Sequence, residues 1–385
     1  MQAVILAAGE GTRVRPLTKS RPKGLIPVVN RPIIEYSIRA LHKIGIREII
    51  VVVGYRREQV TRFLNELDPD IKVVVQEKQL GTAHALKCAG PLVTGNFLLL
   101  PGDNYIDSVS VATIAKMENA MLVKDHPSPS NFGVVLIRNG FVTAIVEKPE
   151  HSPSFTVSTG IFSLTPDVFR YIRSNDLTET ISCMIADGVK IQALIAEDWQ
   201  DALYPWDLIR MNERLLCGIA PEKNGAIHKS ALLQGSVCIG KGVTIGPYTV
   251  IMGPVVIGKD SVIGAHCCIM PNTSIGARGN IEPFSYIGNA LLMDDVSLGS
   301  HSRVSDSVIG EGTRLADHTG IGSRNSVIEI EGCLVKVAFG AIIGDQVSAA
   351  AFSTIRGSII GNGVTIGHEQ RDLSGVTIPD NTLVI

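Results

Sequence analysis

Several features that mark common protein classes are missing from this 385-residue sequence. There is no basic excess, because 35 lysines and arginines face 37 aspartates and glutamates, whereas proteins that track nucleic-acid phosphates usually carry one. No apolar run approaches the roughly 20 residues that a membrane helix needs. The opening residues, MQAVILAAGE, lack the basic region and small-residue cleavage site of a signal peptide. We therefore expect a cytoplasmic protein with neither nucleic acid nor a membrane as partner.

Cysteine pairing motifs are also missing. The seven cysteines are odd in number and scattered, and none forms a Cys-x-x-Cys motif. This pattern argues against both a disulfide framework and a zinc site. We interpret these cysteines as small buried apolar side chains in a reducing environment.

The first half of the chain alternates short apolar runs with amphipathic segments. The spacing predicts strands over 3–8, 48–54, 71–76, 96–103, 132–137, 142–148 and 158–164, and helical segments over 32–45, 57–67, 81–90, 168–173 and 206–216. Such alternation is typical of βαβ units that build a parallel sheet covered on both faces. We therefore predict a Rossmann-like α/β domain over residues 1–218.

The second half has a different period. Isoleucine recurs at every sixth position from Ile239 to Ile287, and glycine often follows it. A period of six fits a hexapeptide solenoid, in which each repeat forms one side of a three-sided prism and isoleucine points inward. We predict a left-handed parallel β-helix over 226–385, with loops leaving the prism where the period slips after Ile287. An ordinary β-sandwich is the alternative. Such prisms bury a shared face by threefold association, so we expect a homotrimer.

A glycine-rich and basic segment follows the first predicted strand, at residues 6–28. A loop in this position exposes backbone N–H groups to phosphate oxygens. A dinucleotide fingerprint would need glycine where Val14 stands, and no Gly-Lys-Ser/Thr follows as a P-loop requires. The segment therefore predicts another kind of phosphate site, with Arg13 and Lys23 as fixed positive charges.

This segment resembles the signature of the sugar-1-phosphate nucleotidylyltransferases. The pattern Gly-x-Gly-Thr-Arg, Pro-Leu-Thr and Pro-Lys is present from Gly9 to Lys23, with departures at Val14 and Gly24. The resemblance implies nucleotide transfer to a sugar-1-phosphate, with Arg13 and Lys23 acting on the phosphates. It implies nucleotide-binding residues at Leu6, Ala8, Gly9, Gly11, Thr12, Gln76, Gly81 and Thr82, of which Gln76 and Gly81 read a pyrimidine.

Later segments resemble other parts of the same family. PGDNY implies that Asp103 holds Mg²⁺, and PWDLIRMNERLL implies Asp207 as the second metal carboxylate. The segments FGVV, VEKP and STGIF imply sugar-phosphate-binding residues at Gly133, Glu147, Lys148 and Thr159. The choice between UTP and dTTP, and between N-acetylglucosamine-1-phosphate and glucose-1-phosphate, remains open at this point.

The whole chain also resembles bifunctional archaeal and bacterial enzymes whose β-helix acetylates an amino-sugar phosphate with acetyl-CoA. Here the sequence keeps Tyr286, but Pro283 stands where those relatives have a histidine, and proline cannot accept a proton. Asp306 aligns with an asparagine of the relatives. Four other histidines are candidates for a displaced base, namely His266, His301, His318 and His368. Three alternatives follow: a nucleotidylyltransferase, a bifunctional enzyme that also uses acetyl-CoA, or a non-catalytic regulatory subunit.

Overall fold

The computed structural model describes residues 1–367 and 371–385, so the candidate base His368 lies outside the described residues. The chain forms two compact units. Unit 1 comprises Met1–Glu10, Pro22–Leu25 and Ile33–Asp201, and unit 2 comprises Gly11–Arg21, Ile26–Pro32 and Ala202–Ile385. None of the helices in the described residues is long and apolar enough to span a membrane.

The two units divide the chain differently from the predicted ranges 1–218 and 226–385. Residues 11–21 and the helix after residue 206 group with the second half of the chain. The physical reason is long-range hydrogen bonding within unit 2. The Asn212 side chain donates to the backbone oxygen of Asn272 at 2.9 Å, and the Asn362 side chain donates to the Pro16 oxygen at 3.1 Å.

Unit 1 is built on a nine-stranded sheet in the order β5-β4-β1-β6-β11-β8-β12-β10-β9. Its strands are β1 (Gln2–Ala7), β4 (Ile49–Val53), β5 (Lys72–Val75), β6 (Phe97–Pro101), β8 (Ala120–Asp125), β9 (Gly133–Arg138), β10 (Phe141–Glu147), β11 (Thr156–Leu164) and β12 (Gln192–Ile195). The four strands β5, β4, β1 and β6 are parallel, as the alternation predicts. The other half is mixed, because β11 runs antiparallel to both β6 and β8.

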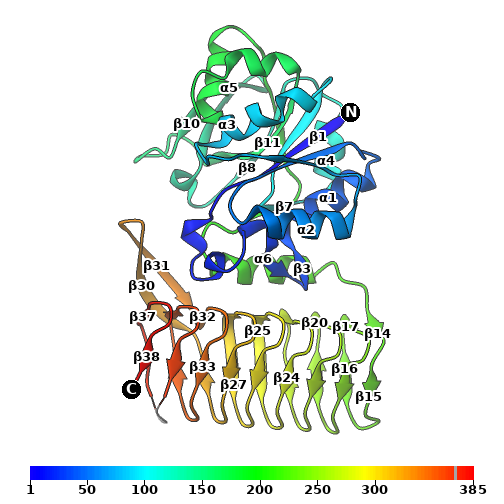
Figure 1. The fold of residues 1–385 in the computed structure, drawn as a ribbon, viewed down its shortest axis with the longest axis vertical. Helices are drawn as coiled ribbons and strands as arrows, with labels where there is room; N and C mark the ends of the chain where they lie inside the picture. The colour runs from blue at the N-terminus through cyan, green and yellow to red at the C-terminus, as the bar shows by residue number, and fades with distance from the viewer. Residues whose placement is uncertain (368–370) are drawn as a thin grey trace. The chain divides into compact units, whose positions relative to one another are not determined.

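Helices cover both faces of this sheet (Figure 1). Helices α1 (Ile33–Lys43), α2 (Arg57–Leu67) and α4 (Ser108–Ile114) bury apolar side chains in one core, with Ile5 and Val51 of the sheet. Helices α3 (Thr82–Ala89) and α5 (Leu177–Ala186) bury theirs in the other core, with Val4 and Val52. Adjacent strand residues therefore face opposite layers, which explains why β4 is continuously apolar.

Unit 2 contains the predicted left-handed parallel β-helix (Figure 1). All nine isoleucines of the six-residue series are at most 1% exposed and belong to one core. Each isoleucine pairs in register with one 18 residues away, as in Ile239–Ile257–Ile275. Three hexapeptides thus make one coil, and the isoleucines stack between coils as the period predicts.

The strands of the β-helix are short, and those of one face run β14 (Glu222–Lys223), β17 (Val237–Ile239), β20 (Val255–Ile257), β23 (Thr273–Ile275), β25 (Tyr286–Leu292), β27 (Arg303–Ile309), β32 (Ala341–Ile343), β35 (Ser358–Ile360) and β37 (Thr377–Ile378). A second face runs β15 (Ala226–Ile227), β18 (Thr244–Ile245), β21 (Val262–Ile263), β24 (Asn280–Ile281), β26 (Ser297–Leu298), β28 (Arg314–Leu315), β33 (Ser348–Ala349), β36 (Thr365–Ile366) and β38 (Leu383–Val384). The third face contains β16 (Leu232–Gln234), β19 (Val250–Met252), β22 (Cys268–Ile269), β29 (Gly320–Ile321) and β34 (Thr354–Ile355). It is joined to the first face through β25 and β27.

The slips in the period have two structural causes, and only one of them is the predicted loop. After Ile281 the register partners are Leu298 and Leu315, so these coils contain 17 residues, and they stay within the prism. One segment does leave the prism, the hairpin of β30 (Arg324–Ile330) and β31 (Cys333–Phe339). The prediction of loops was therefore correct for the hairpin and wrong for the 17-residue coils.

The glycines that follow the isoleucines are needed for close approach between coils. A Cβ on Gly258 would lie 2.5 Å from the Gly276 carbonyl carbon of the next coil. The left-handed backbone positions of the turns are instead occupied by larger residues such as Tyr248, His266 and Phe284, with φ between 57° and 61°. These glycines therefore serve the close packing of neighbouring coils and do not occupy the left-handed turn positions.

Candidate active site

The predicted site residues of unit 1 follow the carboxyl ends of the parallel strands. Ala8 follows β1, Gln76 follows β5, and Asp103 lies just beyond β6. The Gly102 N–H donates to the Leu6 oxygen at 2.8 Å, which ties the end of β6 to the end of β1. In open α/β sheets, ligands bind outside the carboxyl ends of the strands. The predicted nucleotide residues Leu6, Ala8 and Gly9 therefore lie at the edge where such a ligand is expected.

Lys23 is held between two carboxylates. Its Nζ lies 2.9 Å from Asp103 Oδ2 and 3.0 Å from Asp201 Oδ1. The loop reaches this position because Gly24 passes the strand end closely, since a Cβ on Gly24 would lie 2.5 Å from the Gly102 oxygen. The structure thus brings together two of the predicted residues, Lys23 and Asp103, with one that the sequence analysis missed, Asp201.

The environment of Lys23 keeps it positively charged. Burial alone would lower the pKa of Lys23, but the charges and hydrogen bonds of Asp103 and Asp201 outweigh burial, so this pKa lies above its ordinary value. The lysine side chain is only 10% exposed, whereas that of Asp103 is 41% exposed. The buried, positively charged Lys23 therefore contacts a carboxylate, that of Asp103, which is accessible from solvent.

The two carboxylates fit a magnesium site. Mg²⁺ prefers oxygen ligands and is usually bound by one or two carboxylates together with substrate phosphates. Asp103 and Asp201 share one cationic partner, so their carboxylates face the same point. No group of three or more potential metal-ligating side chains occurs within residues 1–367 and 371–385. A pair of carboxylates is thus the kind of donor set available for Mg²⁺ here.

Strand pairing places Asp201 beside Asp103. Asp201 ends the short strand β13 (Trp199–Asp201), which pairs antiparallel with β7 (Asn104–Ile106), and Asp201 lies opposite Asn104 in that register. Asp103 and Asp201 thus occupy neighbouring ends of paired strands. The sequence analysis chose Asp207 because its segment, PWDLIRMNERLL, resembles the family segment that carries the second metal carboxylate.

Asp207 belongs to unit 2, at the start of α6 (Asp207–Leu216). Its Oδ2 accepts a hydrogen bond from the Tyr204 N–H at 2.8 Å, and its Oδ1 accepts one from Arg210. The carboxylate is 8% exposed. These contacts are those of a residue that stabilises the start of a helix.

The predicted pyrimidine-reading residues come together in unit 1. The Gln76 amide nitrogen lies 3.1 Å from the Gly81 oxygen and 2.8 Å from His84 Nδ1, and Gln76 is 2% exposed. Gly81 has φ 145°, and a Cβ there would collide with the Asn175 oxygen. The Thr82 hydroxyl accepts from the Leu177 N–H at 3.1 Å. This part of the site is therefore ordered by its own hydrogen bonds.

The predicted sugar-phosphate residues form a second group in unit 1. Gly133 and Glu147 are opposite each other in the β9–β10 register. Lys148 Nζ lies 3.5 Å from Glu147 Oε1, and both side chains are nearly half exposed. Thr159 differs, because its buried hydroxyl donates to the Leu122 oxygen at 2.9 Å. Glu147 and Lys148 are thus available to a ligand, while the Thr159 hydroxyl is used in the fold.

Arg13 and Thr12 contact an acidic residue of the hairpin within unit 2. The Thr12 hydroxyl donates to Glu331 Oε1 at 2.6 Å, and Arg13 Nε donates to Glu331 Oε2 at 2.8 Å. Gly11 begins this turn with φ 65°, a conformation that favours glycine. Glu331 is a residue that the sequence analysis did not single out, because only the fold places it beside the loop.

Three histidines of the β-helix form part of a stack of rings. Tyr248, His266, Phe284, His301, His318 and Phe352 follow one another with ring centroids 4.5 to 5.1 Å apart. The three histidines therefore share one corner of the prism, beside Pro283. Tyr286 lies under Arg303, whose guanidinium is 4.6 Å from the ring centroid. Asp306 accepts from the Asn289 side chain at 2.8 Å.

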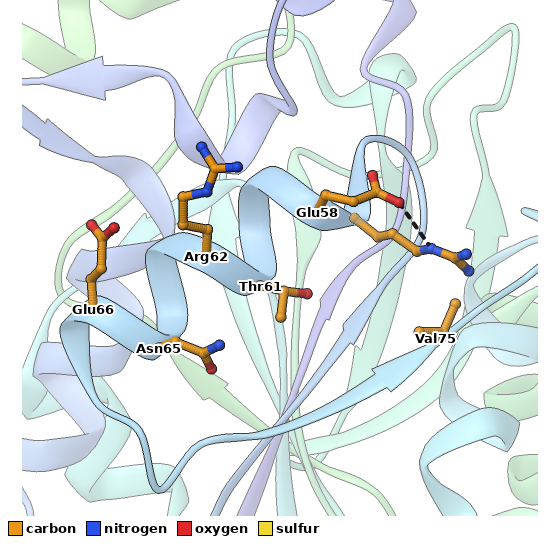
Figure 2. A pocket seen from close by; sticks show the side chains of 7 residues that line it. Glu58, Thr61, Arg62, Asn65, Glu66 and Val75 are labelled. Atoms are coloured by element: carbon orange, nitrogen blue, oxygen red, sulfur yellow. Dashed lines mark hydrogen bonds and ion pairs between the residues drawn. The ribbon is translucent and has the colours of Figure 1, made fainter.

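A separate hollow of about 580 Å³ lies along α2 and the end of β5. Figure 2 shows Glu58, Arg62 and Glu66 on the exposed side of the helix, with Val75 on the strand. Acidic and basic side chains alternate there, so the hollow presents no uniform charge for a polyanion. None of the predicted site residues lines this hollow.

Comparisons with known proteins agree with the division of the chain into an α/β half and a β-helical half. Residues 2–216 match the nucleotidyl transferase family, and residues 251–348 match the GMPPB C-terminal domain. "Bifunctional protein GlmU" of Methanococcus maripaludis is 34% identical over 95% of this chain and 93% of that relative. "Bifunctional sugar-1-phosphate nucleotidylyltransferase/acetyltransferase" of Sulfurisphaera tokodaii is 30% identical over 98% of this chain and 94% of that relative.

A solved structure is also similar to part of this chain. A putative glucose-1-phosphate thymidylyltransferase from Bacillus anthracis, crystallised with sucrose, is 26% identical, with a TM-score of 0.51. The similarity covers 58% of this chain and 98% of that protein. The family match spans more than half of the chain and includes the signature with Lys23 and Asp103. The chain therefore belongs to the nucleotidyl transferase family, and it is a sugar-1-phosphate nucleotidyltransferase with a β-helical second half.

Proposed function

We propose that the protein transfers a nucleotidyl group from UTP or dTTP to N-acetylglucosamine-1-phosphate or glucose-1-phosphate in the presence of Mg²⁺. The products are a nucleotide sugar and pyrophosphate. The observation that carries the proposal is the position of the Lys23 ammonium, within 3.0 Å of both Asp103 and Asp201, at the carboxyl ends of the parallel strands. The two curated relatives and the signature at residues 9–23 support the same reaction class.

The chemical problem is to bring two polyanions together. A phosphate oxygen of the sugar-1-phosphate attacks the α-phosphorus of the triphosphate, and pyrophosphate leaves. That oxygen is already ionised at neutral pH, so positioning and electrostatic stabilisation carry the rate. Lys23, which two carboxylates hold in the charged form despite its burial, supplies positive charge for the α-phosphoryl group. Asp103 and Asp201 would hold Mg²⁺, which would supply further positive charge against the phosphates.

The remaining roles follow from the resemblance and from the side chains available. Gln76 and Gly81 read the pyrimidine, Glu147 accepts hydrogen bonds from sugar hydroxyls, and Lys148 holds the sugar phosphate. Both Glu147 and Lys148 are accessible enough to meet a ligand. The role of Arg13 on the triphosphate rests on the signature alone.

We propose Asp201 as the second metal carboxylate in place of Asp207. Asp201 shares a cation with Asp103, whereas the Asp207 carboxylate accepts hydrogen bonds from Tyr204 and Arg210. Both oxygens of the Asp207 carboxylate therefore already have a partner at the start of α6. Asp207 is therefore assigned to the stability of α6.

Acetyl transfer is not part of the proposal. The β-helix has Pro283 at the position of the expected base, and the histidines of the same corner are stacked on neighbouring rings. A role as a non-catalytic subunit is disfavoured, because Lys23, Asp103 and Asp201 remain together.

The experiment that tests the proposal measures pyrophosphate release from a matrix of five nucleoside triphosphates and two sugar-1-phosphates. We expect turnover with UTP, dTTP or both, dependent on Mg²⁺ and abolished by a chelator. A parallel assay with acetyl-CoA and glucosamine-1-phosphate should show no loss of free amine. Absence of pyrophosphate release with every pair would refute the proposal.

We also propose that the protein forms a homotrimer through the β-helix. The stacked corner leaves three large rings exposed, with Tyr248 at 63%, Phe284 at 54% and Phe352 at 45%. A contiguous exposed apolar ridge marks an association surface. Sedimentation velocity should give the mass of three chains, and a monomer at micromolar concentration would contradict this proposal.

A further inference from the structure

Three polar residues of the β-helix occupy equivalent positions in successive coils. Asp345, Asn362 and Asp380 are spaced by 17 and 18 residues. Each accepts a backbone hydrogen bond from the preceding coil, from Glu311 to Asp345 at 2.8 Å, from Asp345 to Asn362 at 2.7 Å, and from Asn362 to Asp380 at 2.9 Å. One side-chain oxygen of each residue is therefore used within the prism.

The other polar atom of each residue holds residues 16–21 of the signature. The Asn362 side chain donates to the Pro16 oxygen at 3.1 Å, and Asp380 Oδ2 accepts from Lys19 Nζ at 2.6 Å. Asp345 Oδ2 accepts from Arg21 at 2.5 Å and also from the Ser20 hydroxyl. One polar side-chain atom of each residue therefore stabilises the β-helix, and the other holds the loop in place.

Among these three residues, which anchor residues 16–21, Asp345 makes the strongest contact. Its carboxylate is 9% exposed and the Arg21 side chain is 14% exposed, whereas Lys19 in the pair with Asp380 is 40% exposed. Exposed ion pairs contribute little because water screens them, but removing one partner of a buried pair leaves an uncompensated charge. Arg21 also donates to Glu311 at 3.1 Å, which adds to the same anchor.

The anchored end of the loop is connected to its nucleotide-binding end. The Ser20 hydroxyl also lies 3.2 Å from the Leu17 oxygen, and the neighbouring Thr18 hydroxyl donates to the Gly11 oxygen at 2.8 Å. The Val14 N–H donates to the same Gly11 oxygen at 3.0 Å. Fixing Ser20 and Arg21 therefore restrains Gly11, Thr12 and Arg13 through hydrogen bonds within the loop.

We propose that Asp345 is a positioning residue for the nucleotide triphosphate, acting on the signature loop from the β-helix. This inference rests on the proposed function and on the signature, which assigns Gly11, Thr12 and Arg13 to the nucleotide. It makes the β-helix a working part of nucleotidyl transfer in addition to any role in assembly. A loop released from Asp345 samples more conformations, and small displacements of positioning groups cost up to about 100-fold in rate.

The test compares Asp345→Asn with the matched control Asp317→Asn. Asp317 accepts the Ser300 N–H at 2.8 Å, as Asp345 accepts the Glu311 N–H, but it lies outside the contacts described for residues 11–21. Asparagine keeps an acceptor oxygen for the backbone in both variants. Only Asp345→Asn removes the charge that holds Ser20 and Arg21.

We expect Asp345→Asn to raise the KM for the triphosphate about tenfold or more, while the KM for the sugar-1-phosphate stays within about twofold. Asp317→Asn should leave both constants near wild type. A double variant with Arg21→Gln should lose less than the sum of the two single variants, because both changes break the Asp345–Arg21 pair. Equal kinetics for Asp345→Asn and Asp317→Asn, with an active wild type, would overturn the proposal.

Limited trypsin digestion gives a second readout that does not need activity. Opening of the loop exposes the bonds after Arg13 and Lys19, so these should be cut faster in Asp345→Asn than in Asp317→Asn. Thermal unfolding of both variants shows whether the fold is intact. An inactive wild type would count against the proposed function alone, whereas equal cleavage of the two variants would count against the anchor alone.

Discussion

The assignment of the second carboxylate leads to a direct comparison of Asp201→Asn with Asp207→Asn. Asp201 is 18% exposed and lies 3.0 Å from Lys23 Nζ, so its replacement removes one of two charges facing the lysine and one proposed metal ligand. Loss of one preorganised electrostatic contact of this kind costs about 2.7–4 kcal/mol, or roughly 100- to 1,000-fold in kcat. We expect Asp201→Asn to lose at least that much and to need more Mg²⁺.

The effect of Asp207→Asn on kcat should be small. Asparagine still offers an oxygen to the Tyr204 N–H, and the lost partner, Arg210, is 67% exposed. Such a pair is worth about 0–1 kcal/mol. We therefore expect a change in kcat of less than about fivefold and an unchanged Mg²⁺ titration. The assay is initial-rate pyrophosphate release over a range of MgCl₂ concentrations. A large loss in Asp207→Asn together with a small loss in Asp201→Asn would refute the reasoning.

Three further predictions concern single contacts. Lys23→Ala should reduce turnover about 100-fold or more, because it removes the buried cation between the carboxylates; unchanged pyrophosphate release would contradict its role. Glu331→Gln should lower the KM for the triphosphate by up to about fivefold with kcat unchanged, because Arg13 no longer pairs with a half-exposed carboxylate before the nucleotide binds; a raised KM in initial-rate measurements would argue against this competition. Asp107→Ala should destabilise the fold by about 1 kcal/mol at neutral pH, because Asp107 accepts from the backbone N–H groups at the start of α4. Burial acts to raise the pKa of Asp107, but hydrogen bonds from Ser110, Asp198 and Val109 outweigh it and lower the pKa. The stabilisation is therefore present above the unfolded-state pKa of about 3.9 and is lost as the pH falls through the lower folded value. Denaturant titrations at neutral and strongly acidic pH should show the difference between wild type and variant shrinking in acid.

Helices and strands could be predicted from the sequence where buried side chains recur at short, regular intervals. The sequence predicted α2 over its observed residues, Arg57–Leu67, since apolar side chains at helical spacing face one core. It missed α4 and α5, although Leu177, Ile181 and Met184 of α5 share one buried face at helical spacing. It also placed a helical turn at 168–173 where a 3-10 helix spans Pro166–Tyr171. The antiparallel pairing of β11 could not be predicted, because strand direction depends on partners distant in sequence.

Part of the candidate site could likewise be predicted from the sequence. Lys23 and Asp103 could be identified because each stands in a motif of fixed order directly after a strand. Their pairing with Asp201 could not, since that contact spans 178 residues from Lys23.

By itself, the sequence determined the two architectures and the reaction class. A six-residue period of isoleucine buries its side chains inside a three-sided solenoid, and the signature specifies a loop shaped for phosphates. The tertiary structure alone decided that Asp201 shares Lys23 with Asp103, and that Asp345 holds Arg21 across 324 residues. The physical reason is the separation of the residues along the chain. Periodicity within a short segment indicates which side chains are buried, whereas an ion pair depends on where folding brings two distant charges.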